Sequence, residues 1–455
     1  MSLEPLSRRT VLRGGAAAAT LTLLAACEGA RSPSTAATGT PSARMTAPPV
    51  TASPLTAGAN VLVSADDYGV HIEPTVAVDP TSPSRLLAAC QVSPSSDPEF
   101  LATYLSDDGG ATWRAGGVPR LPVGANGDDV TVAFGAQGRG YLCATSYAGG
   151  RAVFVWATDD GGRTFADPVT VLQNQFCDHP WVATSGDQDV YVAWGAGTSK
   201  TALDLARSTD GGRTFGAPRR ILPDATVQTM ASPGPELAAG SGGLVCAVCD
   251  WTTSQDPSGD FVGEVTAVCS TDGGETFGAP AHLGSESSVI TLPGGVQANS
   301  GPTVAVSPSG DAIYVAFPQR KSGSAHSDIV VVRSQDGGRH WSQPVAATPS
   351  DGATYFQPNI AVDASGRIGV SAFALTDGRV DHVLLVSSGQ GLEFQDPVIV
   401  TSAPFDPRTP TTGGKHGAWW IGDYQAIAAA GDAFHLLWND ARSGALQLYA
   451  ATVNG

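Results

Sequence analysis

The chain has 455 residues, 42% of them apolar, so it can bury a large core, and its formal net charge of -17 argues against a nucleic-acid partner. Length alone suggests two or three domains, but an internal repeat overrides that estimate. The 55 glycines and 32 prolines, set among short runs rich in Val, Ala and Tyr, predict an all-β fold with frequent turns.

Residues 1–27 predict an export signal rather than part of the fold. The segment around Arg8 and Arg9 resembles a twin-arginine signal, and the apolar run 16–26 is too short to span a bilayer. Residues 24–27, Leu-Ala-Ala-Cys, resemble a lipobox, so Cys27 is expected to carry a lipid that anchors the protein outside the cytoplasmic membrane. The alternative is a signal peptide that contains a cysteine by chance. Residues 28–59, rich in Ser, Thr, Pro and Ala, predict a flexible linker.

Seven segments, 50 to 66 residues apart, each predict the first strand of a four-stranded antiparallel sheet. They begin at Glu73, Asp128, Asp178, Gly234, Ser300, Gln357 and Gly422. The last unit is one strand short, and the run 60–64 near the N-terminus is expected to supply the missing strand. Closing the ring in this way removes exposed sheet edges. We therefore predict one seven-bladed β-propeller over residues 60–455.

An eight-residue pattern recurs five times, with Ser or Thr first, Asp third, Gly fourth and fifth, and Trp or Phe last. The copies are 106–113, 158–165, 208–215, 270–277 and 334–341, and a degenerate sixth copy, 387–394, has Gly389 in the aspartate position. Asp followed by Gly-Gly between apolar runs predicts a tight turn, because glycine adopts φ > 0 and the carboxylate accepts hydrogen bonds from turn amides. The aspartates are therefore predicted to form turns rather than to catalyse: Asp108, Asp160, Asp210, Asp272 and Asp336.

These repeats resemble the Asp-box (BNR) repeats of the sialidase-like β-propellers. The resemblance implies that the boxes lie away from the catalytic face. Sialidases, however, have six blades, and an Arg-Ile-Pro motif near the first blade carries an arginine that binds the substrate carboxylate. Here residues 70–74 read Val-His-Ile-Glu-Pro, without an arginine. The resemblance therefore extends to the architecture, and the sialidase arginine triad cannot be assigned to this chain.

Cys246 and Cys249 are spaced like a redox or zinc motif, but they lie in a strand-like run, residues 244–249. Redox motifs of this spacing begin helices, and no second Cys or His pair stands at zinc-ligand spacing, so both are predicted to be buried as small apolar residues. Twin-arginine export implies folding before transport, so disulfides are not required. Cys269, on the next predicted strand, is placed to pair with Cys249 across a hairpin.

The first strands of a propeller begin at one face, beside the central channel, so their first residues are expected to form a ring around its mouth. Its polar members are Glu73, Asp129, Asp178, His179, Glu236, Gln357, Asn359, Asp423 and Tyr424. Converging carboxylates repel one another unless protons, a donor-rich ligand or a cation compensates, and calcium is the cation that suits them. The alternative is that these side chains cap strand starts or hold channel water.

Loops between the second and third strands of each blade open on the same face. They contribute Arg151, Trp251, Asp256, Arg320, Lys321, His326 and residues 439–442, and the insert 402–420 is long enough to form a lid. Aromatic, carboxylate and arginine side chains together are typical of sugar sites.

Two functions follow. The first is an exo-acting glycoside hydrolase in which Tyr424 or a ring carboxylate such as Asp423 is the nucleophile and Glu73 or Asp129 is the acid/base. Asp178, His179, Glu236 and Gln357 would bind substrate, and Arg320 or Arg442 would bind an anionic sugar. The second is a non-catalytic, monomeric surface protein that binds a glycan or another extracellular ligand across the same face.

Overall fold

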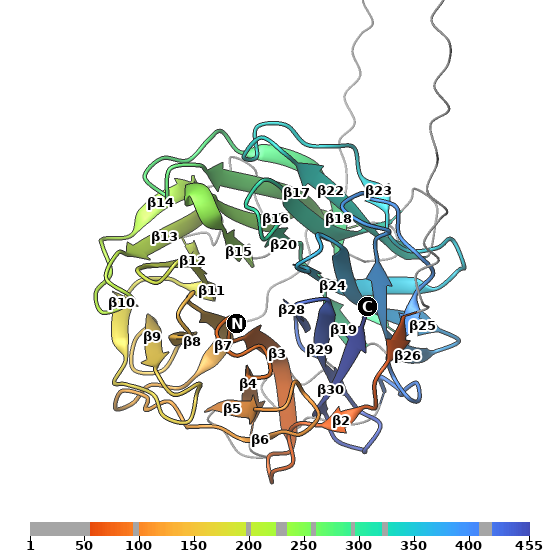
Figure 1. The fold of residues 1–455 in the computed structure, drawn as a ribbon, viewed down its shortest axis with the longest axis horizontal. Helices are drawn as coiled ribbons and strands as arrows, with labels where there is room; N and C mark the ends of the chain where they lie inside the picture. Colours follow the sequence, from red (N-terminus) through yellow and green to blue (C-terminus); the bar gives the residue numbers. More distant parts are fainter. Residues whose placement is uncertain are drawn as a thin grey trace, which may run out of the picture. The chain divides into compact units, whose positions relative to one another are not determined.

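The protein is described by a computed structural model that covers residues 55–93, 100–196, 202–223, 234–255, 261–292, 296–320, 326–408 and 421–455. Seven antiparallel sheets follow one another along the chain and surround a central axis (Figure 1). The prediction of a seven-bladed propeller with four-stranded blades is confirmed. Only one short helical element occurs in the described ranges, the 3-10 turn Ser241–Gly243. None of the helices in these ranges is long and apolar enough to cross a membrane.

The first three blades each contain four strands in a simple up-and-down order. Blade one consists of β3 (Val70–Val78), β4 (Leu86–Ser93), β5 (Phe100–Ser106) and β6 (Arg114–Ala115). Blade two consists of β7 (Asp128–Phe134), β8 (Gly140–Ser146), β9 (Ala152–Thr158) and β10 (Val169–Gln173). Blade three consists of β11 (Asp178–Ser185), β12 (Asp189–Ala196), β13 (Ala202–Ser208) and β14 (Arg219–Leu222).

The next three blades repeat this order, and blade four has a fifth strand at its outer edge. Blade four consists of β15 (Glu236–Ala239), β16 (Val245–Gln255), β17 (Phe261–Ser270), β18 (Ala281–Leu292) and β19 (Val296–Asn299). Blade five consists of β20 (Thr303–Val306), β21 (Ile313–Arg320), β22 (Ser327–Ser334) and β23 (Val345–Ala346). Blade six consists of β24 (Thr354–Val362), β25 (Ile368–Thr376), β26 (Arg379–Val386) and β27 (Val398–Ile399).

Blade seven is completed by the N-terminal part of the propeller, as predicted. It consists of β28 (Ala426–Ala430), β29 (Ala433–Asp440), β30 (Gln447–Asn454) and two short strands, β1 (Thr56–Ala57) and β2 (Val61–Leu62), which both pair with β30. Pairing begins at Thr56, opposite Asn454, four residues before the predicted start of the domain. The innermost strands β3, β7, β11, β15, β20, β24 and β28 each contact the next, and β28 contacts β3, so the ring is closed.

Apolar side chains fill the spaces between neighbouring blades rather than one central core. The described residues contain seven buried apolar clusters, one for each pair of adjacent blades. Each sheet is therefore buried on both faces, which is why its strands read as nearly continuous apolar runs. The starts of the innermost strands, in contrast, carry buried polar side chains, among them Glu73, Asp129 and Gln357.

The aspartates of the five repeats all accept hydrogen bonds within their own turns. In the fourth copy, Asp272 accepts bonds from the backbone and hydroxyl of Thr276, at 2.8 and 2.5 Å, and from the Ser270 hydroxyl at 2.7 Å. These bonds hold the pKa of Asp272 down, to about 2. In the degenerate sixth copy, Gly389 has φ +130°, which an aspartate would not adopt without strain, so this turn follows a different path.

The predicted pairing of Cys249 with Cys269 is wrong, because Cys269 forms a disulfide with Cys246. Cys246 lies directly opposite Cys269 in the β16–β17 ladder, whereas Cys249 lies opposite Thr266. Residues three apart in a strand also point to opposite faces. Cys246 accordingly joins the apolar cluster between blades four and five, and Cys249 the one between blades three and four. Cys249 is buried, as predicted.

We predict that Asp272→Ala lowers the thermal unfolding midpoint by roughly 1–3 °C. The variant loses three accepted hydrogen bonds that organise the turn after β17. Differential scanning calorimetry measures the effect. Asp167→Ala is the control, because the side chain of Asp167 is 84% exposed and its ion pair with Arg120 is long, at 3.8 Å. An unchanged midpoint for Asp272→Ala would show that this carboxylate does not support the turn.

The burial of one histidine predicts that the folded protein is less stable in acid. His382 in β26 is fully buried, stacks on Trp438 at 4.9 Å and has no hydrogen-bond partner for either ring nitrogen among the described residues. Burial lowers its pKa to about 3. Between about pH 3 and about pH 6.5, His382 is protonated in the unfolded chain but not in the folded chain. The free energy of unfolding is therefore highest above about pH 6.5 and decreases as the pH falls.

We therefore expect the free energy of unfolding of the wild type to fall by about 1.4 kcal/mol per pH unit over that window because of His382. The variant His382→Phe should not show this decrease. Urea unfolding at pH 7.5 and pH 5 gives the free energy of unfolding for the wild type and the variant. The exposed His282 supplies the control, His282→Phe. If the wild type and His382→Phe weaken equally on acidification, burial of His382 does not cause the effect.

Candidate functional site

Four innermost strands carry the same backbone irregularity where they meet the channel. Glu73, Asp129, His179 and Gln357 have φ values of +56, +47, +45 and +47°, the left-handed region that non-glycine residues seldom adopt. Each lies where the pairing with the second strand of its blade shifts register. Such bulges re-aim side chains and are common beside active sites. Three of these strained residues, Glu73, Asp129 and His179, also interact with one another at the end of the ring where the innermost strands begin, which we call the channel mouth.

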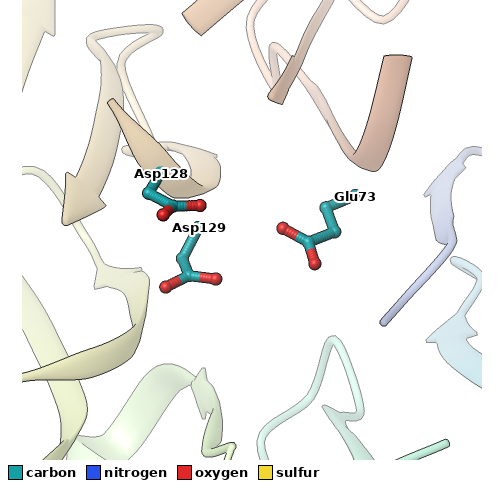
Figure 2. A group of neighbouring side chains, drawn as sticks. All are labelled: Glu73, Asp128 and Asp129. Carbon is teal, nitrogen blue, oxygen red and sulfur yellow. The ribbon is translucent and has the colours of Figure 1, made fainter. Parts of the chain in front are cut away.

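Three carboxylates meet at this point. Glu73 from β3 and Asp128 and Asp129 from β7 each offer one oxygen, and these oxygens all lie within 4.8 Å of one another. Figure 2 shows the Glu73 carboxylate directed toward those of Asp128 and Asp129. Glu73 and Asp129 are only 1% and 6% exposed, and Asp128 is half-buried. Burial and the neighbouring Asp423 and Asp129 raise the pKa of Glu73 well above its usual range.

His179 stands between two further acids of the ring. Its Nε2 atom lies 3.4 Å from Asp423 and 3.9 Å from Asp129. Burial alone would lower the pKa of the imidazole, but Asp129, Asp423 and Asp178 together raise it well above its usual value. The ring thus contains a positively charged histidine among carboxylates.

Tyr147 is a site residue that the sequence analysis missed. Its hydroxyl donates to Asp129 at 2.9 Å and lies 2.5 Å from Asp178, and the Thr145 hydroxyl donates to the same Asp129 oxygen at 3.1 Å. The guanidinium of Arg151, which was expected near the ring, stacks on the Tyr147 ring at 4.8 Å. Tyr147 follows β8, on the same loop as Arg151, so its position on a mouth-facing loop was the available signal.

Tyr424 forms part of the wall beside His179. Its ring lies 6.1 Å from that of His179 and 5.6 Å from that of Trp181, both edge-on. Its hydroxyl donates to the backbone carbonyl of Val130 at 3.3 Å. Burial, followed by the charges of Glu73, Asp129 and Asp423, raises the pKa of this phenol well above its usual value. The Tyr424 side chain therefore remains protonated.

A second polar network links blades four, six and seven. Asn359 donates to Glu236 at 3.4 Å and to the carbonyl of Gln425 at 3.0 Å. Gln357 bonds the carbonyl of Gly422 at 2.5 Å and accepts from Gln425 at 2.8 Å. Burial raises the pKa of Glu236 to about 8, although the Val304 N–H donates a hydrogen bond to it at 3.2 Å. Glu236, Gln357 and Asn359 are thus joined to one another rather than to the acids around His179.

The two predicted sugar-binding arginines differ from the ring residues in their setting. Arg442 bonds Asp440, Asn60 and Ser402 and stacks on Tyr449 at 4.6 Å, so it fastens the closing N-terminal segment to blade seven. Arg320 ends β21, opposite Ser327. Cys27, Asp256, Lys321 and most of the predicted lid, residues 409–420, lie outside the described residues.

No protein-family model and no curated protein matches the chain. Several solved structures are similar to it. An α-L-arabinofuranosidase from Fusarium graminearum, in complex with an iminosugar inhibitor, is 14% identical over 88% of this chain and 98% of its own, with a TM-score of 0.51. A protein of unknown function from Dyadobacter fermentans is 13% identical over 88% and 99%, with a TM-score of 0.50. A polysaccharide lyase acting on ulvan is 12% identical over 84% and 94%, also with a TM-score of 0.50. At these identities the likeness shows the propeller fold alone.

Proposed function

We propose that the protein is an extracytoplasmic, lipid-anchored propeller that acts on glycans as an exo-acting glycoside hydrolase. The observation that carries the proposal is the convergence of Glu73, Asp129 and Asp423 on one channel mouth, with His179 and Tyr424 between them. The α-L-arabinofuranosidase and the ulvan lyase have similar folds, so propellers of this architecture do act on glycans.

Glycosidic cleavage requires a proton donor and a second carboxylate that acts as nucleophile or base. Asp423 is assigned as the nucleophile or base, because His179, 3.4 Å away, can hold its carboxylate in place for that role. Glu73 and Asp129 complete the site, either as the proton donor or as ligands of a cation that holds the sugar. Tyr424 and Trp181 provide aromatic surface for a sugar ring. Tyr424 is given this wall role rather than that of nucleophile, because its hydroxyl donates to the backbone carbonyl of Val130 and burial disfavours the phenolate.

A second function, glycan or protein recognition without turnover, is favoured by the burial of the acids. Glu73 is only 1% exposed, whereas a catalytic acid must reach the bond that it protonates. Residues 70–74 also contain no arginine that could bind the carboxylate of an anionic sugar. The recognition function therefore remains the alternative that the activity test must exclude.

We predict that the purified full chain releases the reporter from one member of a panel of aryl glycosides that includes an α-sialoside and an α-L-arabinofuranoside. Asp423→Asn should lower kcat/KM by about 10²- to 10⁴-fold, because it removes the carboxylate that acts as nucleophile or base. Asp167→Asn, which changes an exposed acid by the same chemistry, should leave kcat/KM unchanged. If folded protein releases the reporter from no glycoside in the panel, the hydrolase proposal is refuted and glycan binding is the next measurement.

We predict that Tyr424→Phe lowers kcat/KM by no more than about 10-fold, because the variant keeps the aromatic wall and loses one hydrogen bond to a backbone carbonyl. The measurement uses whichever glycoside the wild type cleaves. A loss of 10³-fold or more would instead assign the nucleophile to the Tyr424 hydroxyl, as in sialidases.

A further inference from the structure

One atom in the channel mouth lacks the partner that its burial demands. The Oε2 atom of Glu73 is buried and accepts no hydrogen bond within the described part of the chain. The side chain is 1% exposed and is aimed at Asp128 and Asp129 (Figure 2). A buried carboxylate oxygen without a partner is costly, so its position indicates that something not part of the chain binds there.

We propose that Glu73, Asp128 and Asp129 bind a divalent cation, calcium, at the mouth of the central channel. Their offered oxygens lie within 4.8 Å of one another. Calcium binds oxygen ligands at about 2.3–2.6 Å, so ligands on opposite sides of the ion stand about 5 Å apart, and those at smaller angles are closer. The three oxygens can therefore share one ion. Two come from consecutive residues at the β7 bulge and the third from the equivalent bulge in β3.

The charges around the cluster also favour a cation. Glu73 makes no ion pair with any Lys or Arg in the described ranges, and the basic partner given for Asp129 is His179, 3.9 Å from its Oδ1 atom. Tyr147 and Thr145 both donate to the other oxygen, Oδ2, and neither donates to Oδ1. Asp178 and Asp423 place two more carboxylates nearby, and the repulsion that they add to the cluster favours a bound cation.

The ligand chemistry selects calcium over other divalent ions. All three ligands are carboxylate oxygens, which hard cations prefer, whereas zinc favours sulfur and nitrogen ligands. Magnesium demands nearly ideal octahedral geometry, which carboxylates fixed at two strand bulges supply less readily than the irregular geometry of a calcium site. Asp128 is half-buried, so further coordination positions on that side remain available to water or to sugar hydroxyls. The site goes beyond the proposed function and stands whether or not the protein cleaves glycans.

Isothermal titration calorimetry of the chelator-treated full chain with calcium chloride tests the site. We expect one equivalent to bind, magnesium to bind at least 10-fold more weakly, and Glu73→Gln and Asp129→Asn each to lower calcium affinity at least 10-fold. Asp167→Asn is the matched control, because it removes the same charge from an exposed position and should leave the affinity unchanged.

Terbium luminescence provides a second readout, because Tyr147, Trp181 and Tyr424 lie near the cluster and can sensitise a bound lanthanide. Circular dichroism checks that each variant is folded. If one of them is not folded, Asp128→Asn, a change at the half-buried ligand, is measured in its place. The proposal is overturned if the wild type shows neither heat nor luminescence, or if the variants bind like the wild type. Neither readout depends on turnover, so a silent glycoside panel would leave the cation result interpretable.

Discussion

Repulsion among like charges on one axis is the constraint on which the arrangement of the channel mouth depends. Seven-fold repetition brings the same strand position to the same place in every blade, so any acidic residue there meets its counterparts. Glu73, Asp129 and Asp423 occupy such positions, and His179 is a basic partner of both Asp129 and Asp423. The left-handed bulges add backbone strain to this repulsion. Both costs fall on the same few residues, which is typical of a binding site rather than of a structural core.

The rest of the molecule provides the stability that offsets the repulsion and backbone strain at the channel mouth. The apolar clusters between blades hold each sheet on both faces, and the aspartate turns stabilise hairpins away from the mouth. These two features are repeated around the ring. The functional residues, in contrast, come from individual blades and differ from one blade to the next. Repetition builds the scaffold, and departures from repetition build the site.

The fold was predictable because its signals are local and repeated. Each aspartate turn is contained in eight residues, and each innermost strand carries its own polar start. The pairings within the site were not predictable, because they join distant positions: Tyr147 reaches Asp178 over 31 residues, and Asn359 reaches Glu236 over 123. The disulfide illustrates a finer limit. Choosing Cys246 over Cys249 requires the exact register of β16 on β17, which depends on where the loop between them begins.

The pairing of β1 and β2 with β30 imposes an order on folding. The first strands to be synthesised cannot find their partner until the last, which ends at Asn454, has been made. Blades one to six are built from local hairpins and can form during synthesis, but the interface between blades seven and one must wait for the complete chain. Closure is therefore a late, long-range step, and a truncated chain would retain two open blade faces. A closed ring therefore shows that the chain has been made as far as β30.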